Sequence, residues 1–221
     1  GMVGVSCALA LQQKGLQVCL IDRLPPGSET SHGNAGVLAT GSLIPFNNPS
    51  LWSQLPALLR GKSAGFRYSP AYLLRQLPWA LRFVSQARPA VFAQTVPALH
   101  TLITQSRKMH QAWLAQAGAS GHLREDGWLY LYRSQAAWRA AAWARELYAE
   151  HGVAFENCES TDLRALEPAL QPVFAKGVWF KDSASVDDPG QVVRAYARLF
   201  VERGGRLRQA EIGRVQRVVP A

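Results

Sequence analysis

The chain has 221 residues, a hydrophobic content of 48% and a formal net charge of +9, from 24 basic and 15 acidic residues. This length accommodates one large or two small domains, and the apolar content is normal for a globular protein with a sizeable core. The basic residues are scattered and accompany no nucleic-acid-binding motif, which argues against DNA or RNA as the partner. No apolar run reaches the ~18 residues of a membrane-spanning helix.

The first 22 residues have the spacing of a dinucleotide-binding fingerprint. Residues 1–4 (Gly-Met-Val-Gly) lead into a helix-like run that stops at Gly15, and a strand-like run over 17–21 ends at Asp22. In such a fingerprint one glycine lets the backbone approach the pyrophosphate, and another lets the helix pack closely on the sheet. The acidic residue about 20 positions further on binds the ribose. The first glycine and the strand before it are absent, so we expect both ends of the chain to be cut from a longer dinucleotide-binding protein.

Residue spacing within this segment predicts its packing. Small and apolar side chains at intervals of four, three and four predict one sheet-facing side of the helix, made by Gly4, Ala8, Leu11 and Gly15. Apolar character predicts a buried parallel strand through Val18, Leu20 and Ile21.

The following elements are expected in chain order. Over residues 47–85 we expect short helical pieces that are broken at Pro49, Pro56, Pro70 and Pro78. Beyond them we expect a helix over 90–116 that is interrupted early by Pro97, and a helix over 135–150. We also expect strands over 128–132, 153–155 and 177–180, and a helical turn over 160–166. Asp188 is a good N-cap with Pro189 in the first turn, and Val192, Tyr196, Leu199 and Phe200 predict that helix's buried stripe. A strand over 206–218 would then return to the first sheet.

Four segments carry a family resemblance. They are Glu29–Leu38 (ETSHGNAGVL), 126–132 (DGWLYLY), 166–170 (LEPAL), and the helix that opens at Asp188-Pro189 and closes at Gly204-Gly205. In this order and spacing the chain resembles the FAD-dependent D-amino acid oxidase/dehydrogenase superfamily, and most closely the bacterial D-amino acid dehydrogenases of the small-subunit type.

The resemblance implies an α/β fold: an incomplete Rossmann-like FAD/NAD(P)-binding domain with an inserted mixed α/β substrate domain. We place the first part of the FAD domain at 1–46, the substrate domain at 47–185 and the return to the FAD domain at 186–221. The long excursion after residue 46 independently favours a two-domain flavoprotein, because an NAD-only Rossmann domain would continue directly with βαβ units. Family members are nearly twice this length, so much of the substrate pocket is expected beyond residue 221.

The implied cofactor is FAD. The residues assigned to it are Gly1, Met2, Val3, Gly4, Asp22, Arg23, Ser31, His32, Asn34, Ala35 and Gly36. The helix N-terminus would face the pyrophosphate, and Arg23 would lie over the adenine or near a phosphate. Ser31 and Asn34 would bind the phosphate or ribityl region, and Gly33, Ala35 and Gly36 would keep the backbone close to the isoalloxazine.

The implied reaction is hydride transfer from the Cα–H of a D-amino acid to flavin, followed by hydrolysis of the imine to a 2-oxo acid and ammonia. No catalytic residue and no metal site is assigned, and the carboxylate-binding Arg is expected beyond the chain. Tyr130, Tyr132 and His32 are pocket candidates that more plausibly have structural roles. Asp187 and Asp188 more plausibly cap a helix than form a catalytic pair. The remaining histidines, His100, His110, His122 and His151, are expected at the surface.

Three functional alternatives remain open. The chain could belong to a related FAD amine oxidoreductase acting on glycine, sarcosine or a hydroxyproline isomer, or these 221 residues alone could fail to hold flavin and be poorly soluble. The electron acceptor could be a quinone or another electron carrier rather than oxygen. Residues 72–84 mix Arg, Trp and aliphatic side chains, so peripheral contact with the cytoplasmic face of the inner membrane is the alternative to packing within the domain.

The three cysteines, Cys7, Cys19 and Cys158, have no metal or redox spacing. Cys7 and Cys19 lie in the first helix and strand, where buried thiols are ordinary. We therefore expect reduced thiols in a cytoplasmic protein.

Overall fold

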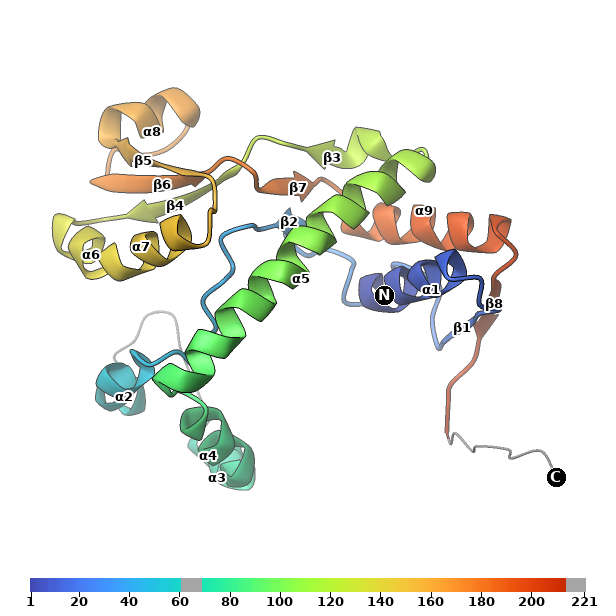
Figure 1. Cartoon of the computed structure of the whole chain (residues 1–221), viewed down its shortest axis with the longest axis horizontal. Helices are drawn as coiled ribbons and strands as arrows, with labels where there is room; N and C mark the ends of the chain where they lie inside the picture. Colours follow the sequence, from blue (N-terminus) through green and yellow to red (C-terminus); the bar gives the residue numbers. More distant parts are fainter. Residues whose placement is uncertain (61–68, 214–221) are drawn as a thin grey trace. The chain divides into compact units, whose positions relative to one another are not determined.

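The computed structural model describes residues 1–60 and 69–213 of the chain (Figure 1). These residues form two compact units. Unit 1 comprises residues 1–39, 106–130 and those from 178 on, and unit 2 comprises 40–105 and 131–177. The predicted boundaries at 46 and 185 remain predictions, and residues 106–130 group with unit 1 although the sequence placed them in the insertion.

Unit 1 is a mixed α/β unit. Its elements are α1 (Met2–Gln13), β1 (Cys19–Asp22), β2 (Val37–Leu38), the 3-10 turn η1 (Ser120–His122), β3 (Leu123–Arg124), β7 (Ala184–Val186), α9 (Pro189–Glu202) and β8 (Arg206–Gln209). Three further elements cross the unit boundary, namely α5 (Pro89–Gln116), β4 (Trp128–Tyr132) and β6 (Lys176–Phe180).

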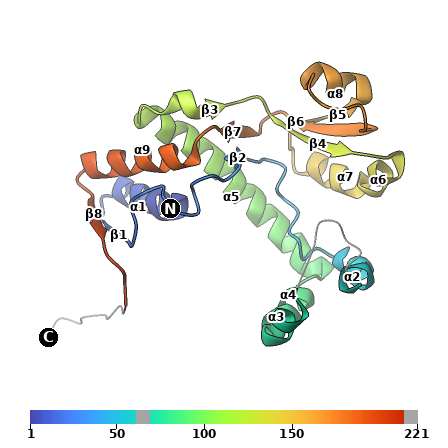
Figure 2. The same ribbon diagram turned by 180° about the vertical axis from the view of Figure 1, so that it is seen from behind.

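The core of unit 1 is the contact between α1 and α9, which lie side by side in both views (Figures 1 and 2). Helix α9 buries all four residues of its predicted stripe. Helix α1 buries Val5, and one turn later Ala8 and Leu9, on the same side. The prediction for Leu11 was wrong: its side chain is exposed, because the buried stripe of α1 follows Val5 and Leu9 toward α9.

Strands β1 and β8 pair in parallel, with Cys19 opposite Arg206 and Asp22 opposite Gln209. The expected return of a late strand to the first strand is confirmed, although β8 ends at Gln209 and the expected residues 214–218 lie outside the described residues. Of the strand residues predicted to be buried, Val18 and Leu20 pack partly buried against the core, whereas Ile21 is exposed, and so is Cys19. Cys7 is also exposed, and Cys158 is buried; all three thiols are free.

Two three-stranded sheets complete the strand pattern. One has the order β2-β7-β3, with antiparallel pairing on both sides of β7, and the other has the order β4-β6-β5. Strand β4 has the predicted bounds, whereas β2, β3 and β7 were not predicted from the sequence. These short strands have two or three residues each, which is too short for a period-two pattern to be recognised.

Unit 2 is largely helical. Its elements are α2 (Leu51–Leu59), α3 (Pro70–Arg75), α4 (Leu77–Ser85), α6 (Gln135–Ala140), α7 (Ala142–Glu150), β5 (Phe155–Glu159) and α8 (Ser160–Leu166). Pro70 and Pro78 lie in the first turns of α3 and α4, as expected for proline, but Pro56 lies inside α2 instead of breaking it. The predicted strand over 153–155 lies later in the chain, at β5.

The helix predicted over 135–150 is two helices. At the break, the N–H of Ala141 is shared between the carbonyl oxygens of Ala137 and Trp138, at 3.2 Å each, and the Trp138 carbonyl also accepts from the guanidinium of Arg145 at 2.9 Å. Helix α6 ends at Ala140, and α7 begins after Ala141. The Arg145 guanidinium also lies 3.5 Å from the centre of the Trp138 ring, a cation–π contact that holds this junction.

Within residues 1–60 and 69–213, no helix combines the length and the apolar character needed to cross a membrane.

Candidate cofactor site

The N-terminus of α1 is the centre of the candidate site. Gly1 is the N-cap, and the first helical hydrogen bond runs from Val5 N–H to the Gly1 carbonyl at 3.2 Å. The N–H groups before Val5 have no helical acceptor, as in any first turn, and the first turn contains no acidic side chain. Free N–H donors and the helix dipole together favour an anion at this end.

Ser31 lies directly at this helix end. Its hydroxyl oxygen accepts a hydrogen bond from Met2 N–H at 3.0 Å, and the side chain is buried, with only 5% of the residue exposed. A Cβ placed on Gly1 would lie 3.4 Å from this oxygen, so glycine leaves a little room beside the serine. Because a hydroxyl can accept and donate at once, Ser31 retains its own hydrogen for a further acceptor.

Asp22 ends β1 beside the same helix end. Its Oδ2 lies 3.2 Å from the amino nitrogen of Gly1, its Oδ1 accepts from Leu24 N–H at 3.4 Å, and one third of its side chain is exposed. Asp22 is thus an accessible carboxylate next to the α1 N-terminus, where the fingerprint spacing predicts an acidic residue.

Gly4 faces β1 as predicted, but without a strict steric demand. A Cβ at this position would meet Leu20 Cδ1 at 3.6 Å, an ordinary van der Waals distance. Val3 is exposed at the same helix end.

Arg23 points away from the helix end toward its own loop. Its guanidinium forms an ion pair with Glu29 at 2.7 Å, and this partner raises the pKa of the arginine. Its carbonyl oxygen accepts from Gln209 Nε2 at 3.2 Å, which joins the end of β1 to β8 a second time. The expected contact of Arg23 with adenine or phosphate remains a prediction.

The loop after β1 is shaped by Asn34. The side-chain oxygen of Asn34 accepts from Gly36 N–H at 2.8 Å, and its amide nitrogen donates to the Thr30 carbonyl at 3.3 Å. These bonds make Asn34 an organiser of the turn, and its predicted contact with the cofactor stays untested. His32 and Ala35 are exposed on this loop.

Two glycines of the loop pack closely against the start of α9. Gly27 and Gly36 both have positive φ, and a Cβ on Gly27 would lie 2.3 Å from the Gly190 carbonyl oxygen. A Cβ on Gly36 would lie 2.2 Å from the carbonyl oxygen of Val186, whose N–H donates to the Gly36 carbonyl at 2.8 Å. This contact was not predicted from the sequence; its signal is glycine at both ends of the loop and Gly190 directly after Pro189.

Asp188 caps α9 as predicted, but Asp187 does not. Asp188 accepts from Gln191 N–H at 2.8 Å. Asp187 instead accepts from His122 Nδ1 at 2.7 Å and from the Arg124 guanidinium at 3.1 Å. These bonds, from His122 first, hold the pKa of Asp187 below its usual value. The cluster ties β3 to the end of β7.

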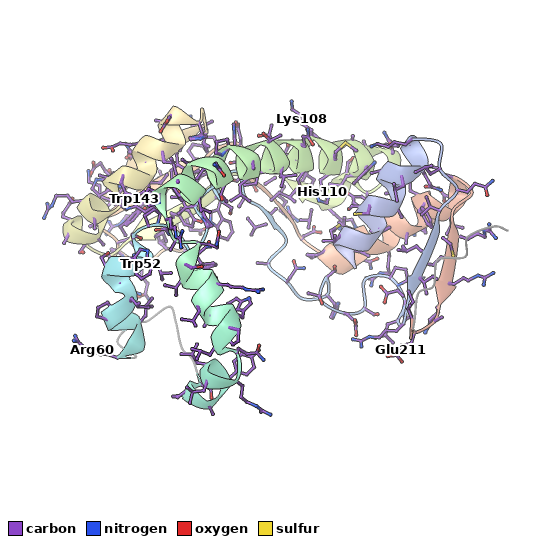
Figure 3. The ribbon with its side chains drawn as sticks, turned by 60° about the horizontal axis from the view of Figure 1, so that its bottom comes forward. Trp52, Arg60, Lys108, His110, Trp143 and Glu211 are labelled. Atoms are coloured by element: carbon purple, nitrogen blue, oxygen red, sulfur yellow. The ribbon has the colours of Figure 1, made fainter. Side chains whose placement is uncertain are left out.

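The four remaining histidines, expected at the surface, are half-buried. His110, labelled on α5 in Figure 3, has its Nδ1 3.0 Å from the hydroxyl of Tyr196, which donates to the His110 carbonyl at 3.1 Å. Burial lowers the pKa of His110 and raises that of Tyr196. The rings of His100 and His151 contact each other edge to face. Aromatic packing of His100, His110 and His151, and the bond of His122 to Asp187, account for the difference; sequence spacing does not reveal such contacts.

The tyrosine pocket candidates have packing partners. Tyr130 contacts Phe180 edge to face at 5.2 Å, and Tyr132 contacts Trp138 in the same way. Within the described parts of the chain, no group of three or more His, Cys, Asp or Glu side chains could hold a metal ion.

Comparison with known proteins agrees with this geometry. The family model described as "FAD dependent oxidoreductase" (DAO) matches residues 1–220. The chain belongs to this family. Its relatives include a D-amino-acid oxidase of Bradyrhizobium diazoefficiens, 29% identical over 96% of the chain, and D-amino acid dehydrogenase 2 of Ralstonia nicotianae, 32% identical over 77% of the chain. The chain spans 51% and 40% of the lengths of these two relatives.

Solved structures of FAD-dependent oxidoreductases share the fold. Glycine oxidase from Geobacillus kaustophilus is similar with a TM-score of 0.63 over 95% of the chain and 44% of its own length. L-proline dehydrogenase from P. horikoshii is similar with a TM-score of 0.60 over 94% of the chain and 41% of its own length. Both are 16% identical in sequence, so they show the α/β fold alone. The predicted fold class is confirmed.

FAD, the cofactor of the DAO family, fits the residues that are present. The pyrophosphate of FAD is an anion, and the α1 N-terminus offers unbonded N–H groups, a free serine hydrogen and no competing acidic side chain in its first turn. Asp22 offers a carboxylate for hydroxyl donors at the same place. The predicted cofactor is therefore confirmed at the level of the family, while the individual contacts remain predictions.

Proposed function

We propose that the protein oxidises the Cα–N bond of a D-amino acid. The substrate would lose a hydride from Cα and a proton from its nitrogen, giving an imine that water converts to a 2-oxo acid and ammonia. A bound FAD would supply the acceptor for the hydride, which carries both electrons. The observation that carries the proposal is that relatives named for D-amino acids are similar over most of this chain.

The residues of unit 1 would act in holding the cofactor. The N–H groups of the first turn of α1 and the free hydrogen of Ser31 would bind the pyrophosphate oxygens. Asp22 would accept hydrogen bonds from the ribose hydroxyls. Asn34 and the two docked glycines would fix the path of the loop that reaches from Asp22 toward the flavin.

The chemistry at Cα makes only limited demands on side chains. The amine must be neutral when the hydride leaves, and a cation must hold the carboxylate, but a side-chain base is not required. We therefore assign no catalytic residue among the described residues. Glycine, sarcosine or hydroxyproline as the substrate, and quinone or oxygen as the acceptor, remain the alternatives that an assay must separate.

The test uses the intact protein that contains this chain. The purified protein is offered a panel of D-amino acids, their L-enantiomers, glycine, sarcosine and hydroxyproline isomers, with an artificial electron acceptor. We expect a yellow protein that reduces the acceptor with at least one D-amino acid and releases equal amounts of 2-oxo acid and ammonia. Turnover of glycine or sarcosine alone would assign the second function, and a colourless protein would contradict the flavoprotein assignment.

A further inference from the structure

Strand β7 of unit 1 joins the loop of the candidate cofactor site to a second part of the unit (Figures 1 and 2). It is the middle strand of the sheet β2-β7-β3. On one side it pairs with β2, which directly follows the loop at 31–36, and on the other side it pairs with β3. Because β2 and β3 have two residues each, the backbone ladders are short, and side-chain bonds at the end of β7 contribute a large share of what holds it.

The loop ends on β7 at Gly36. The Gly36 carbonyl accepts from Val186 N–H at 2.8 Å, and the Gly36 N–H donates to the side-chain oxygen of Asn34 at 2.8 Å. A Cβ on Gly36 would lie 2.2 Å from the Val186 carbonyl oxygen, so the backbones of the loop and of β7 are in close contact. The other end of the loop is Ser31, at the α1 N-terminus. The position of β7 therefore determines where the Gly36 end of the candidate site lies.

Asp187, the residue after β7, makes three bonds in the opposite direction. Its N–H donates to the His122 carbonyl at 3.1 Å, its Oδ1 lies 2.7 Å from His122 Nδ1, and its Oδ2 accepts from the Arg124 guanidinium at 3.1 Å. Successive N–H groups of a strand point to opposite sides, so Val186 bonds the loop and Asp187 bonds the β3 side. The bond from Arg124 is charge-assisted, which is the stronger class of hydrogen bond. Asp187 thus braces β7 on the side opposite the loop.

We propose that Asp187 is a positioning residue for FAD. By bracing β7 against β3, it fixes the backbone at Gly36 and with it the loop that begins at Ser31. Because Asp22 is placed at the adenosine ribose, this loop is left for the flavin half of the cofactor. Asp187 acts through β7 and the loop and does not itself touch FAD. The inference rests on the FAD dependence of the family and not on the identity of the substrate, so its failure is distinct from failure of the D-amino acid assignment.

The test is FAD binding by the intact protein that contains this chain, measured by fluorescence titration of the apoprotein. Asp187→Ala should weaken FAD binding roughly 3- to 30-fold, because the loop is no longer held in its binding position. Asp187→Asn keeps an oxygen that can accept one of the two side-chain bonds, so it should recover part of this loss. At saturating FAD, the visible circular dichroism of the bound flavin should change in Asp187→Ala, because the backbone beside the flavin has moved.

Asp162→Ala in unit 2 is the matched control for a merely structural role. The Asp162 carboxylate accepts from Glu159 N–H at 2.8 Å in the capping box of α8, so this change also removes a hydrogen-bonded aspartate and costs stability. We expect it to lower the melting temperature but to leave FAD affinity and the visible circular dichroism unchanged. The proposal is overturned if Asp187→Ala and Asp162→Ala bind FAD equally well, or if the flavin spectrum of Asp187→Ala is that of the unchanged protein.

A milder variant keeps the proposal testable if Asp187→Ala does not fold. Arg124→Gln removes the outer bond of the cluster from a largely exposed side chain and leaves the bonds between Asp187 and His122 in place. We expect it to weaken FAD binding about 2- to 10-fold. An unchanged FAD affinity in Arg124→Gln would then overturn the proposal.

Discussion

The hydroxyl oxygen of Ser31 lies 3.0 Å from the backbone nitrogen of Met2 and accepts its hydrogen bond. This bond joins the loop after β1 to the first turn of α1, so the two parts of the candidate site that the sequence separates are held as one. A phosphate bound at the helix end would therefore meet a serine that is already oriented and already buried.

Replacement of Ser31 by alanine should leave the Met2 N–H without its acceptor. We expect the free energy of unfolding to fall by about 1 kcal/mol, as for loss of a helix cap, and flavin affinity to fall as well. Thermal unfolding and flavin fluorescence titration of the intact protein measure the two effects. Ser28→Ala is the control in the same loop, because Ser28 is exposed and bonds only the nearby Pro25 carbonyl. Equal effects of both changes would count against the role of Ser31.

Asp22→Ala should weaken FAD binding without a large loss of fold. Removing charge-assisted hydrogen bonds worth about 1–3 kcal/mol lowers affinity roughly 5- to 150-fold. Fluorescence titration of the apoprotein with FAD measures the change. Asp182→Ala, at an exposed turn of the same unit, should leave the affinity unchanged. An unaltered FAD affinity in Asp22→Ala would show that Asp22 does not bind the ribose.

Gly33 and Gly36 form a matched pair for a test of the loop. Both have positive φ, at 69° and 64°, but a Cβ on Gly33 meets nothing within 4 Å, whereas one on Gly36 meets the Val186 carbonyl. Gly33→Ala should cost about 1–2 kcal/mol of backbone strain. Gly36→Ala should add roughly 1–3 kcal/mol of overlap. Chemical denaturation of the two variants gives the difference, and equal stabilities would show that the loop does not dock on β7.

Elements whose own residues determine their conformation were predicted correctly from the sequence. The cap at Asp188, the proline starts of α3 and α4 and the bounds of β4 follow from local chemistry, and each is confirmed. Asp22 was placed correctly because the fingerprint fixes its distance from the helix end. The exposure of Leu11 could not be predicted in this way, because it depends on which element covers α1.

Contacts between segments that lie far apart in the sequence could not be predicted either. Nothing in the local sequence says that Asp187 binds His122 and Arg124, or that Gly27 touches Gly190. Such contacts depend on the fold that brings the segments together, and a single sequence shows them only as unexplained polar or glycine residues.

The pKa shift of Asp187 makes the stability of the folded protein depend on pH in a definite direction. Its pKa is lower in the folded protein than in the unfolded chain, so its contribution to stability is present above the unfolded value of about 4 and is lost as the pH falls through the folded value. We expect Asp187→Asn to lower the melting temperature at neutral pH. The deficit should shrink below about pH 4. A deficit that stays constant down to acid pH would exclude the linkage.

His110 makes stability depend on pH as well, at higher pH values than Asp187. Its burial lowers its pKa, so below about pH 6.5 the unfolded chain binds a proton that the folded protein binds less readily. Stability should therefore fall as the pH drops from about 7.5 to about 5.5. His110→Gln, which cannot titrate, should show a smaller fall in melting temperature over the same range. Parallel pH profiles for the two proteins would contradict this assignment.

The parallel pairing of β1 with β8 determines when unit 1 can fold during its synthesis on the ribosome. Residues 19–22 leave the ribosome well before their partner at 206–209, which is synthesised 187 residues later, counted from Cys19 to Arg206. At about 5–20 residues per second, β1 waits roughly 10–40 seconds for β8, and α1 waits for α9. Throughout that interval the apolar side of α1 is uncovered. A nascent chain that stalls within unit 2 would thus be a substrate for chaperones, whereas release of α9 and β8 would close unit 1 in one late step.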